Sequence, residues 1–424
     1  MPFASLGLSS ELLPAFLRSL AEKGHVAPTP IQSEAIPAIL QGRDVLASAQ
    51  TGSGKTAAFA LPLLQQCALG PVGRPRRVQG LVLVPTRELA AQVGETLHQL
   101  GKHLPRRVKV VVVFGGVAIN PQMVELRGGA DIVVATPGRL LDLVAKNAVR
   151  LGALSTLVLD EADRLLSLGF GEELGRVLAL LPVRRQNLLF SATFPAAIEA
   201  LASDLLQDPL RIELQSATPA VAEIQQRAIE VDSGRRSQLL LELIRSEGWT
   251  RALVFVATKN AAERVANRLY KAGIEAQPFH GELTQGRRNQ TLKDFKASLV
   301  QVLVATDVAA RGVDIAHLPV VVNFDLPRSA VDYTHRIGRT GRAGERGMAV
   351  SFVSADTEAH FRLIEKRQGL RVVRERVAGF EPVDVVAPNP ADPQGVGGIK
   401  GARPSKKDKA RAAAALAKAV PKKD

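Results

Sequence analysis

The sequence predicts two α/β domains in tandem, each built on a parallel sheet, followed by a disordered basic tail. Short, nearly continuous runs of Val, Leu and Ile alternate with amphipathic stretches of helical length, which is typical of parallel strands covered by helices on both faces. The series breaks around residues 214–222 and then resumes. From Pro388 onward the chain is rich in Pro, Gly, Lys and Ala and lacks a core-forming pattern.

The alternation places the expected elements and boundaries. Domain 1 is predicted over residues 1–212, a linker over 213–224, domain 2 over 225–387 and the tail over 388–424. Residues 1–42 read as helices around a proline-containing turn at 26–32. In domain 1 the predicted strands are 45–47, 81–84, 110–114, 132–135, 157–159 and 187–190, and the predicted helices include 57–64, 88–100 and 121–127. In domain 2 the predicted strands are 228–231, 252–256, 276–279, 302–305, 320–324 and 349–353.

The composition favours a polyanionic partner. The 424 residues carry a net charge of +14, and nine Lys/Arg against two acids lie from Lys400 onward. Such a balance indicates nucleic acid first and a membrane surface second. The longest apolar runs fall far below the ~18 residues that span a bilayer, so no membrane segment is expected. Cys67 is the only cysteine, which fits a reducing cytoplasm.

A glycine-rich stretch between a predicted strand and a predicted helix indicates a phosphate-binding loop. It reads Ala49-Gln50-Thr51-Gly52-Ser53-Gly54-Lys55-Thr56. Gly52 and Gly54 let backbone N–H groups turn toward an anion, and the following helix N-terminus adds positive potential. Lys55 is predicted to reach the β- and γ-phosphates and the Thr56 hydroxyl to bind Mg²⁺. The alternative is a glycine-rich turn without a ligand.

An acidic cluster follows the buried strand predicted at 157–159. Asp160 is predicted to hold Mg²⁺ and Glu161 to act as general base on the attacking water. The alternative for these acids is a helix N-cap. The loop with Lys55 about 100 residues upstream makes a nucleotide hydrolysis site the stronger interpretation.

Three arginines spaced by glycines lie in domain 2, in the stretch 335–342, His-Arg-Ile-Gly-Arg-Thr-Gly-Arg. Arg339 and Arg342 suit charge stabilisation on a γ-phosphate bound by the other domain. The alternative is a basic loop that faces RNA.

These strings occur in the order that resembles a DEAD-box ATP-dependent RNA helicase. The resemblance covers about residues 3 to 380 and rests on Gln32, 49–56, Pro-Thr-Arg-Glu-Leu at 85–89, Thr-Pro-Gly-Arg at 136–139, Asp-Glu-Ala-Asp at 160–163, Ser-Ala-Thr at 191–193, 305–314 and 335–342. The short N-terminal segment and basic tail resemble the bacterial RhlE-like branch. The resemblance implies two RecA-like domains, with ATP and RNA bound across their cleft.

The same resemblance implies the nucleotide contacts. Gln32 would read the adenine edge, Phe3 would stack on adenine, and Asp314 with Gly312 would contact the ribose side of ATP. Asp163, Ser191, Thr193 and His335 would couple the acidic cluster to RNA binding. Taken alone, Ser-Ala-Thr is a helix N-cap.

The RNA side is expected to consist of small residues and arginines that contact the backbone without reading bases. In domain 1 these are Pro85, Thr86, Arg87, Gly115, Gly116, Thr136, Pro137, Gly138 and Arg139. In domain 2 they are Thr258, Gly281, Gln285, Arg288, Thr306, Asp307 and Arg311.

The resemblance predicts RNA-stimulated ATP hydrolysis that opens short duplexes, with ATP and RNA each tightening the other. Ribosome assembly and RNA decay stay open as settings. One alternative is a processive DNA translocase with the same two-domain motor. The other is a non-enzymatic RNA-binding protein that depends on the basic tail.

Overall fold

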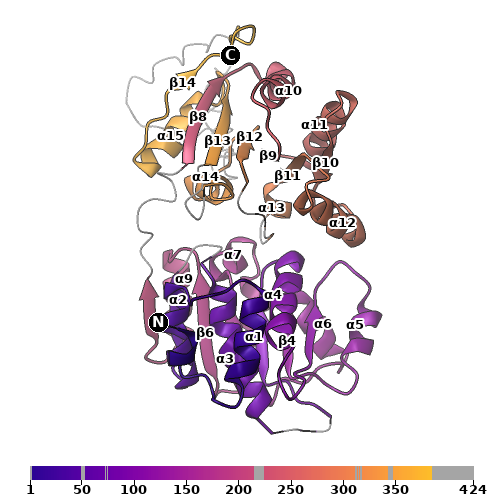
Figure 1. The fold of residues 1–424 in the computed structure, drawn as a ribbon, viewed down its shortest axis with the longest axis vertical. Helices are drawn as coiled ribbons and strands as arrows, with labels where there is room; N and C mark the ends of the chain where they lie inside the picture. Colours follow the sequence, from indigo (N-terminus) through magenta and orange to yellow (C-terminus); the bar gives the residue numbers. More distant parts are fainter. Residues whose placement is uncertain are drawn as a thin grey trace, which may run out of the picture. The chain divides into compact units, whose positions relative to one another are not determined.

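The computed structural model describes residues 2–48, 53–71, 73, 75–213, 224–310, 313, 315, 318–341 and 347–383. Two α/β domains with seven-stranded parallel sheets are present, as the sequence predicts (Figure 1). Domain 1 carries strands β1–β7 and domain 2 carries β8–β14. The predicted basic tail and most of the predicted linker lie outside the described residues. No helix in the described part of the chain is both long enough and apolar enough to cross a bilayer.

The sheet of domain 1 has the strand order β3-β4-β2-β5-β6-β1-β7. Its strands are β1 (Val45–Ser48), β2 (Gly80–Leu83), β3 (Val110–Val113), β4 (Ile132–Ala135), β5 (Thr156–Leu159), β6 (Gln186–Ser191) and β7 (Leu210–Glu213). The helices are α1 (Leu13–Glu22), α2 (Pro30–Leu40), α3 (Lys55–Leu69), α4 (Arg87–Leu100), α5 (Ile119–Glu125), α6 (Pro137–Ala145), α7 (Ala162–Ser167), α8 (Gly171–Leu178) and α9 (Ala196–Leu205), after a short 3₁₀ turn at Phe3–Ser5.

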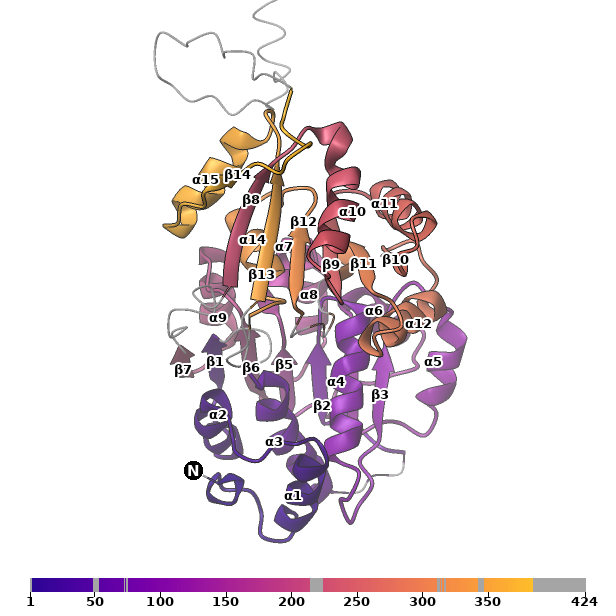
Figure 2. The same ribbon diagram turned by 45° about the horizontal axis from the view of Figure 1, so that its top comes forward.

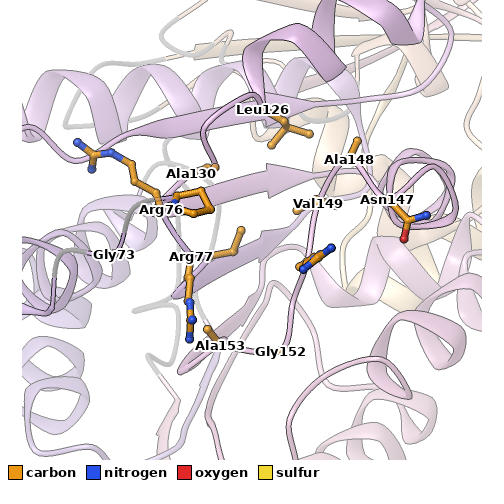
Figure 3. A pocket seen from close by; sticks show the side chains of 14 residues that line it. Gly73, Arg76, Arg77, Leu126, Ala130, Asn147, Ala148, Val149, Gly152 and Ala153 are labelled. Atoms are coloured by element: carbon orange, nitrogen blue, oxygen red, sulfur yellow. The ribbon is translucent and has the colours of Figure 1, made fainter.

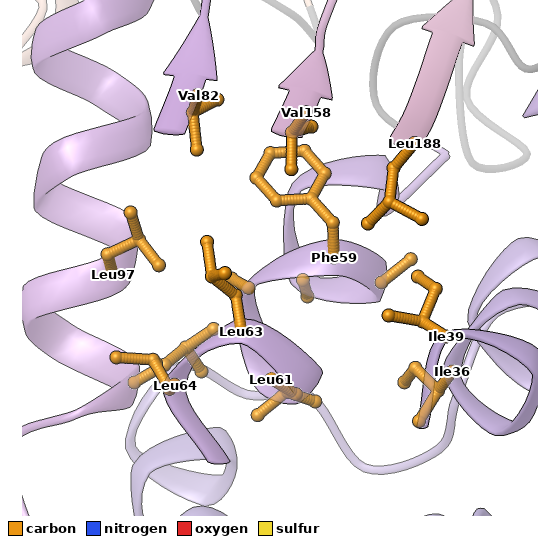
Figure 4. Close-up of a cluster of buried hydrophobic side chains, with 14 of the residues drawn as sticks. Ile36, Ile39, Phe59, Leu61, Leu63, Leu64, Val82, Leu97, Val158 and Leu188 are labelled. Atoms are coloured by element: carbon orange, nitrogen blue, oxygen red, sulfur yellow. The ribbon is translucent and has the colours of Figure 1, made fainter. Parts of the chain in front are cut away.

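Alternate residues of each strand face opposite sides of this sheet, so the domain has two apolar cores. Val82 faces a core shared with α1, α2, α3 and α4. Leu81 and Leu83 face the other core, which α6, α7, α8 and α9 complete. Figure 4 shows the first core, where Phe59 and Leu63 of α3 lie among side chains from α2, α4 and three strands. Burial on both faces explains why the strands read as continuous apolar runs.

Gly94 permits a close approach between a helix and the sheet in this domain. Gly94 lies in the middle of α4, and a Cβ at this position would overlap Cγ2 of Val112 in the neighbouring segment of β3. Valine is stiff at this branch point, so it cannot easily move aside. The absence of a side chain therefore lets α4 pack closely against the sheet.

Domain 2 repeats the architecture with the strand order β10-β11-β9-β12-β13-β8-β14 (Figure 2). Its strands are β8 (Ile224–Glu230), β9 (Ala252–Val256), β10 (Ala276–Phe279), β11 (Val302–Thr306), β12 (Val320–Asn323), β13 (Gly347–Val353) and β14 (Arg374–Glu375). Its helices are α10 (Arg236–Ser246), α11 (Lys259–Lys271), α12 (Gln285–Lys296), α13 (Asp307–Ala310), α14 (Ala330–Ile337) and α15 (Glu358–Gln368), with a 3₁₀ turn at Ser233–Arg235.

Most predicted strands are found to within two residues, and three strands differ more. β8 begins at Ile224, four residues before the predicted 228. The sequence pattern does not reveal this first half as a strand because it is mostly polar and partly exposed. β7 and β14 were not predicted, since both are short edge strands with charged residues. An edge strand buries only part of its surface, so it lacks the continuous apolar run that marks a central strand.

Candidate nucleotide and RNA site

The predicted site residues of domain 1 follow the carboxyl ends of its parallel strands. In a sheet of this kind these ends meet at one edge, where ligands commonly bind. The phosphate-loop residues follow β1, Pro85 to Arg87 follow β2, Gly115 and Gly116 follow β3, Thr136 to Arg139 follow β4, Asp160 and Glu161 follow β5, and Ser191 to Thr193 close β6. The sheet topology therefore gathers at one edge motifs that lie far apart in the sequence.

The described part of the phosphate loop runs from Ser53 into α3. Gly54 has a φ of +90°, and a Cβ there would collide with the side-chain amide of Gln32. Only glycine fits this position without strain. Lys55 is the first residue of α3 and is buried, with Thr56 behind it. Ala49, Gln50, Thr51 and Gly52, which were predicted to complete the loop, lie outside the described residues.

Gln32 connects the N-terminal helices to this loop. Its amide nitrogen donates to the carbonyl oxygen of Gly54 at 3.1 Å, and its Oε1 accepts from the backbone N–H of Thr29 at 3.0 Å. The side chain is 2% exposed. An amide group has two hydrogens and two lone pairs. One of each is used here, so one donor and one acceptor are left over.

Phe3 lies in the core rather than at an open surface. It is 3% exposed and belongs to the apolar cluster that includes Leu6 and Leu8. Stacking on a base requires a free ring face. The predicted stacking of Phe3 on adenine would therefore require this ring to move, and it stays a prediction.

Asp160 and Glu161 form a buried acidic pair at the end of β5. Oδ1 of Asp160 accepts from the backbone N–H of Glu161 at 2.9 Å, and Oε2 of Glu161 accepts from Nη1 of Arg164 at 2.9 Å. Burial raises the pKa of Asp160 to about 6, the charge of Lys55 opposes this rise, and the neighbouring Glu161 adds to it. The fold thus keeps the Asp160 carboxylate in a buried place where a nearby cation, such as Lys55, stabilises its charged form.

The backbone of Glu161 adopts an uncommon conformation. Its φ of +51° and ψ of +50° fall in the left-handed region, which costs non-glycine residues free energy. The backbone turns at Glu161, between β5 and α7. Asp160 still pairs with the neighbouring strand, since its N–H donates to the Leu83 carbonyl at 3.0 Å. The pair of carboxylates therefore lies at the edge of the sheet, directly after β5.

The predicted coupling residues contact one another within domain 1. The hydroxyl of Thr193 donates to Oδ2 of Asp163 at 3.2 Å, and that of Ser191 donates to the Thr193 carbonyl at 2.7 Å. Oδ1 of Asp163 is buried and has no hydrogen-bond partner among the described residues. In domain 2, burial lowers the pKa of His335 to about 4, so this ring is neutral near pH 7.

The predicted RNA residues of domain 1 are also linked to each other. Thr86 caps α4 by accepting from the N–H of Leu89 at 3.3 Å, and Nη1 of Arg87 donates to the Gly116 carbonyl at 3.4 Å. The N–H of Gly115 donates to the Thr136 hydroxyl at 3.3 Å. The residues that line one hollow include Pro85, Thr86, Arg87, Gly115, Gly116, Thr136, Gly138 and Arg139, and also Asp142, Leu168 and Phe170, which the sequence does not single out.

Arg139 has unused hydrogen-bonding capacity in this hollow. Its Nη2 donates to the Val117 carbonyl at 2.8 Å, and its Nε lies 3.6 Å from Oδ2 of Asp142. Nε and Nη1 are nevertheless buried and make no hydrogen bond within the described residues. Buried donors of this kind are costly unless a partner arrives. A phosphate oxygen would supply that partner.

In domain 2, several predicted RNA residues have local structural roles. Thr258 caps α11 by accepting from the N–H of Ala261 at 3.1 Å, and Gln285 donates to Oδ1 of Asn289 at 2.9 Å. The carboxylate of Asp307 accepts two hydrogen bonds from Arg336, at 2.6 and 2.7 Å. Thr306 ends β11, and an added Cβ at Gly281 would meet nothing within 4 Å. Arg311 lies outside the described residues.

Arg288 is buried, at 5% exposure. Its guanidinium carbon lies 4.6 Å from the centre of the Phe279 ring, and its Nη1 donates to the His280 carbonyl at 3.1 Å. Its Nε is buried and has no hydrogen-bond partner among the described residues. The RNA contact of Arg288 stays a prediction.

Of the residues that domain 2 is predicted to contribute to the ATP site, Arg339 lies within the described residues. It is buried and donates from Nη1 to the Val313 carbonyl at 2.8 Å. Arg342, Gly312 and Asp314 lie outside the described residues.

Comparisons with known proteins agree with this arrangement. Residues 29–201 match the DEAD/DEAH box helicase family and residues 235–344 match the family described as helicase conserved C-terminal domain. The chain is 42% identical over 364 residues to the DEAD-box ATP-dependent RNA helicase CshA of Bacillus cereus (strain ATCC 10987 / NRS 248). The aligned part covers 86% of this chain and 67% of the relative.

It is also 43% identical over 370 residues to the ATP-dependent RNA helicase DeaD of Escherichia coli (strain K12), covering 87% of this chain and 57% of that relative. Among solved structures, the chain is similar to S. cerevisiae Dbp5 bound to RNA and ADP BeF₃, with a TM-score of 0.77, 32% identity and coverage of 88% of this chain and 95% of that one. The two parallel-sheet domains are thus RecA-like. On these grounds the chain belongs to the DEAD-box ATP-dependent RNA helicase family.

Proposed function

We propose that this chain hydrolyses ATP when RNA is bound, and that it uses the cycle to open short RNA duplexes locally and to remodel RNA or RNA–protein complexes. The observation that carries the proposal is the buried Asp160–Glu161 pair at the same sheet edge as Lys55. The hollow lined by Arg87 and Arg139 at that edge supplies a matching place for a phosphate backbone.

The residues at this edge fit ATP and Mg²⁺. A hydroxyl and a carboxylate are oxygen ligands of the kind that Mg²⁺ prefers, so Thr56 and Asp160 would hold it. The bound nucleotide supplies the phosphoryl bond that breaks, and the cation neutralises charge on its phosphates. Lys55 would bind the β- and γ-phosphates, and Glu161 would accept the proton of the attacking water. The remaining loop contacts would come from Ala49, Gln50, Thr51, Gly52, Ser53 and Gly54.

Gln32 would recognise the base with the donor and acceptor that it does not use inside the protein. Phe3 would stack on adenine, and Gly312 and Asp314 would contact the nucleotide from domain 2. Arg339 and Arg342 would stabilise the charge that develops on the γ-phosphate. Arg339 would exchange its bond to the Val313 carbonyl for this role.

RNA would be held by backbone contacts, so that its sequence matters little. ATP and single-stranded RNA would both favour a closed arrangement of the domains, and linkage then requires that each tightens the other. Asp163, Ser191, Thr193 and His335 would transmit this coupling. The hydrogen bond between Thr193 and Asp163 is the contact that supports it.

We infer domain 1 over 1–212, a linker over 213–224, domain 2 over 225–387 and a disordered tail over 388–424. The basic composition of that tail supports membership of the RhlE-like branch and an added electrostatic contact with RNA. A cytoplasmic location and ribosomal or RNA-decay partners complete the proposal.

Steady-state ATP hydrolysis with and without oligo-U tests the proposal. Glu161→Gln should lower the RNA-stimulated rate by roughly 10²–10⁴-fold, the range of a general base. RNA binding, measured by fluorescence anisotropy, should persist. Glu125→Gln on exposed α5 is the matched control and should leave both unchanged.

Two outcomes would replace the proposal. Stimulation by single-stranded DNA as strong as that by RNA would favour a DNA translocase. Duplex opening or annealing that survives Glu161→Gln but disappears on removal of residues 388–424 would favour a non-enzymatic RNA-binding protein.

A further inference from the structure

A second cavity lies at the opposite end of the domain 1 sheet. It has a volume of about 730 Å³ and is lined by residues that precede three strands: 75–78 before β2, 126–130 before β4, and 147–153 before β5. These strands are neighbours in the order β4-β2-β5, so their amino ends lie together. A four-residue strand is roughly 13 Å long. The cavity is therefore separated by the sheet from Lys55, Asp160 and the RNA residues at the carboxyl ends.

The described lining of this cavity is cationic and contains no carboxylate. Its charged members are Arg76, Arg77 and Arg150. Arg76 forms an ion pair with the buried carboxylate of Asp131, which also accepts from the N–H of Lys109 at 2.7 Å. Arg77 and Arg150 are exposed and form no ion pair or hydrogen bond with any described residue. Two guanidinium groups are thus available to an anion.

The wall that carries the arginines is firmly built. The N–H of Arg76 donates to the Gly128 carbonyl at 3.0 Å. Gly129 has a φ of +81°, and a Cβ there would collide with the Arg76 carbonyl. This close backbone contact fixes the segment before β2 against the turn before β4, so the cavity does not depend on side-chain packing alone.

The floor of the cavity is apolar, and one neutral polar group lies on its rim. Val78, Leu126, Ala130 and Val149 are buried and form the floor. Figure 3 shows Arg76 and Arg77 on one side and Asn147 on the other, with the apolar residues between them. An asparagine amide can both donate to and accept from the edge of a base.

We propose that this cavity is a second site for a nucleoside phosphate, in which Arg77 and Arg150 bind the phosphate and the base lies over Val78 and Val149. Guanidinium groups pair with phosphate through two parallel hydrogen bonds, which suits them to this ligand. The volume lies within the range of small-molecule sites. A concave apolar floor fits a flat base better than an extended acidic peptide. The ligand is either a free nucleotide or a nucleotide of RNA.

Equilibrium dialysis of the full chain with labelled GMP, and separately with 5′-phosphorylated tetra-uridylate, tests the site. Arg77→Ala removes one phosphate contact. Gly152→Trp fills the cavity instead, at a position where an added Cβ would meet nothing within 4 Å. Each change should weaken binding by about tenfold or more: Arg77→Ala because it removes a hydrogen bond between charged groups, and Gly152→Trp because it occupies the space of the ligand. Lys55→Ala, which removes the phosphate-loop lysine, should leave this binding intact.

The matched control is Arg264→Ala, which removes an arginine from a surface hollow of domain 2 that also contains Glu263, Glu275 and Glu282. It should change nothing, and RNA-stimulated ATP hydrolysis should be normal in the Arg77→Ala and Gly152→Trp variants, which shows that they fold. If both variants weaken the binding of GMP, the ligand is a free nucleotide. If they weaken only the binding of the oligonucleotide, the ligand is a nucleotide of RNA.

The proposal is overturned if neither probe responds to Arg77→Ala or Gly152→Trp. It is also overturned if a short acidic peptide responds to them while both nucleotide probes do not, because the cavity would then serve a protein partner. Loss of GMP binding in Lys55→Ala alone would place the probe in the phosphate loop and likewise refute a second site.

Discussion

Replacement of the buried acid at the end of β5 should stabilise the ligand-free protein in a pH-dependent way. The pKa of Asp160 is about 6 in the fold and 3.8 in its reference state, because burial disfavours its charge. Well below pH 3.8 the group is protonated in both the folded and the unfolded chain and contributes nothing. Above pH 6 it is charged in both, and the folded state carries the full cost. At about 1.4 kcal/mol per unit, the shift corresponds to roughly 3 kcal/mol.

The Asp160→Asn side chain stays neutral at every pH and still accepts from the N–H of Glu161 through its Oδ1. Its gain in free energy of unfolding should therefore grow from about 0.5 kcal/mol at pH 4 to about 3 kcal/mol at pH 8. Urea unfolding followed by far-UV circular dichroism at several pH values measures this gain.

Domain 2 provides an internal control. The chain has a single tryptophan, Trp249, which is buried in domain 2. Its fluorescence transition should be the same in the wild type and in Asp160→Asn. An equal gain at pH 4 and pH 8, or a loss of stability at pH 8, would refute the assignment of the cost to the buried charge.

Three further predictions concern packing and RNA binding. Arg139→Ala should weaken RNA binding and reduce the slope of log K against log salt concentration by about 0.7. Arg139→Lys keeps the charge, so it should restore this slope without the full affinity. Anisotropy titrations between about 50 and 200 mM salt measure both quantities. Gly94→Ala should cost about 1–2 kcal/mol of stability because its Cβ overlaps Val112, and adding Val112→Ala should recover that loss in urea unfolding. Arg336→Ala should destabilise domain 2 by about 3 kcal/mol, read from Trp249 fluorescence, because it leaves buried and partly buried acceptors without a donor; an unchanged midpoint would contradict this.

The central strands could be predicted because both of their faces are buried. The run at 110–114 is almost entirely valine, and β3 covers Val110–Val113. The helix predicted at 88–100 is α4, Arg87–Leu100, where the apolar side chains recur at helical spacing. Edge strands escape this reasoning. Arg211 and Glu213 of β7 are exposed and pair with each other, so their alternation resembles a loop.

The location of the site could also be predicted, but the contacts of individual residues could not. Glycine, lysine and paired acids mark the sheet edge because their chemistry is needed there. Whether an arginine faces a ligand or the interior depends on tertiary packing. Arg288 lies in a stretch of mostly polar residues, yet it is buried against the ring of Phe279 and donates to the His280 carbonyl. Nothing local in the sequence marks this difference.

The two ends of the domain 1 sheet show what kind of information a sequence carries. At the carboxyl ends, each loop contains residue types that are unusual for their position, so each can be recognised alone. At the amino ends, the cavity takes ordinary arginines, alanines and valines from three loops that are roughly 20 to 50 residues apart in the chain. They become a candidate site only because β4, β2 and β5 are adjacent in the sheet. Strand order is a property of the folded domain, and it is the step at which individually unremarkable residues acquire a common function.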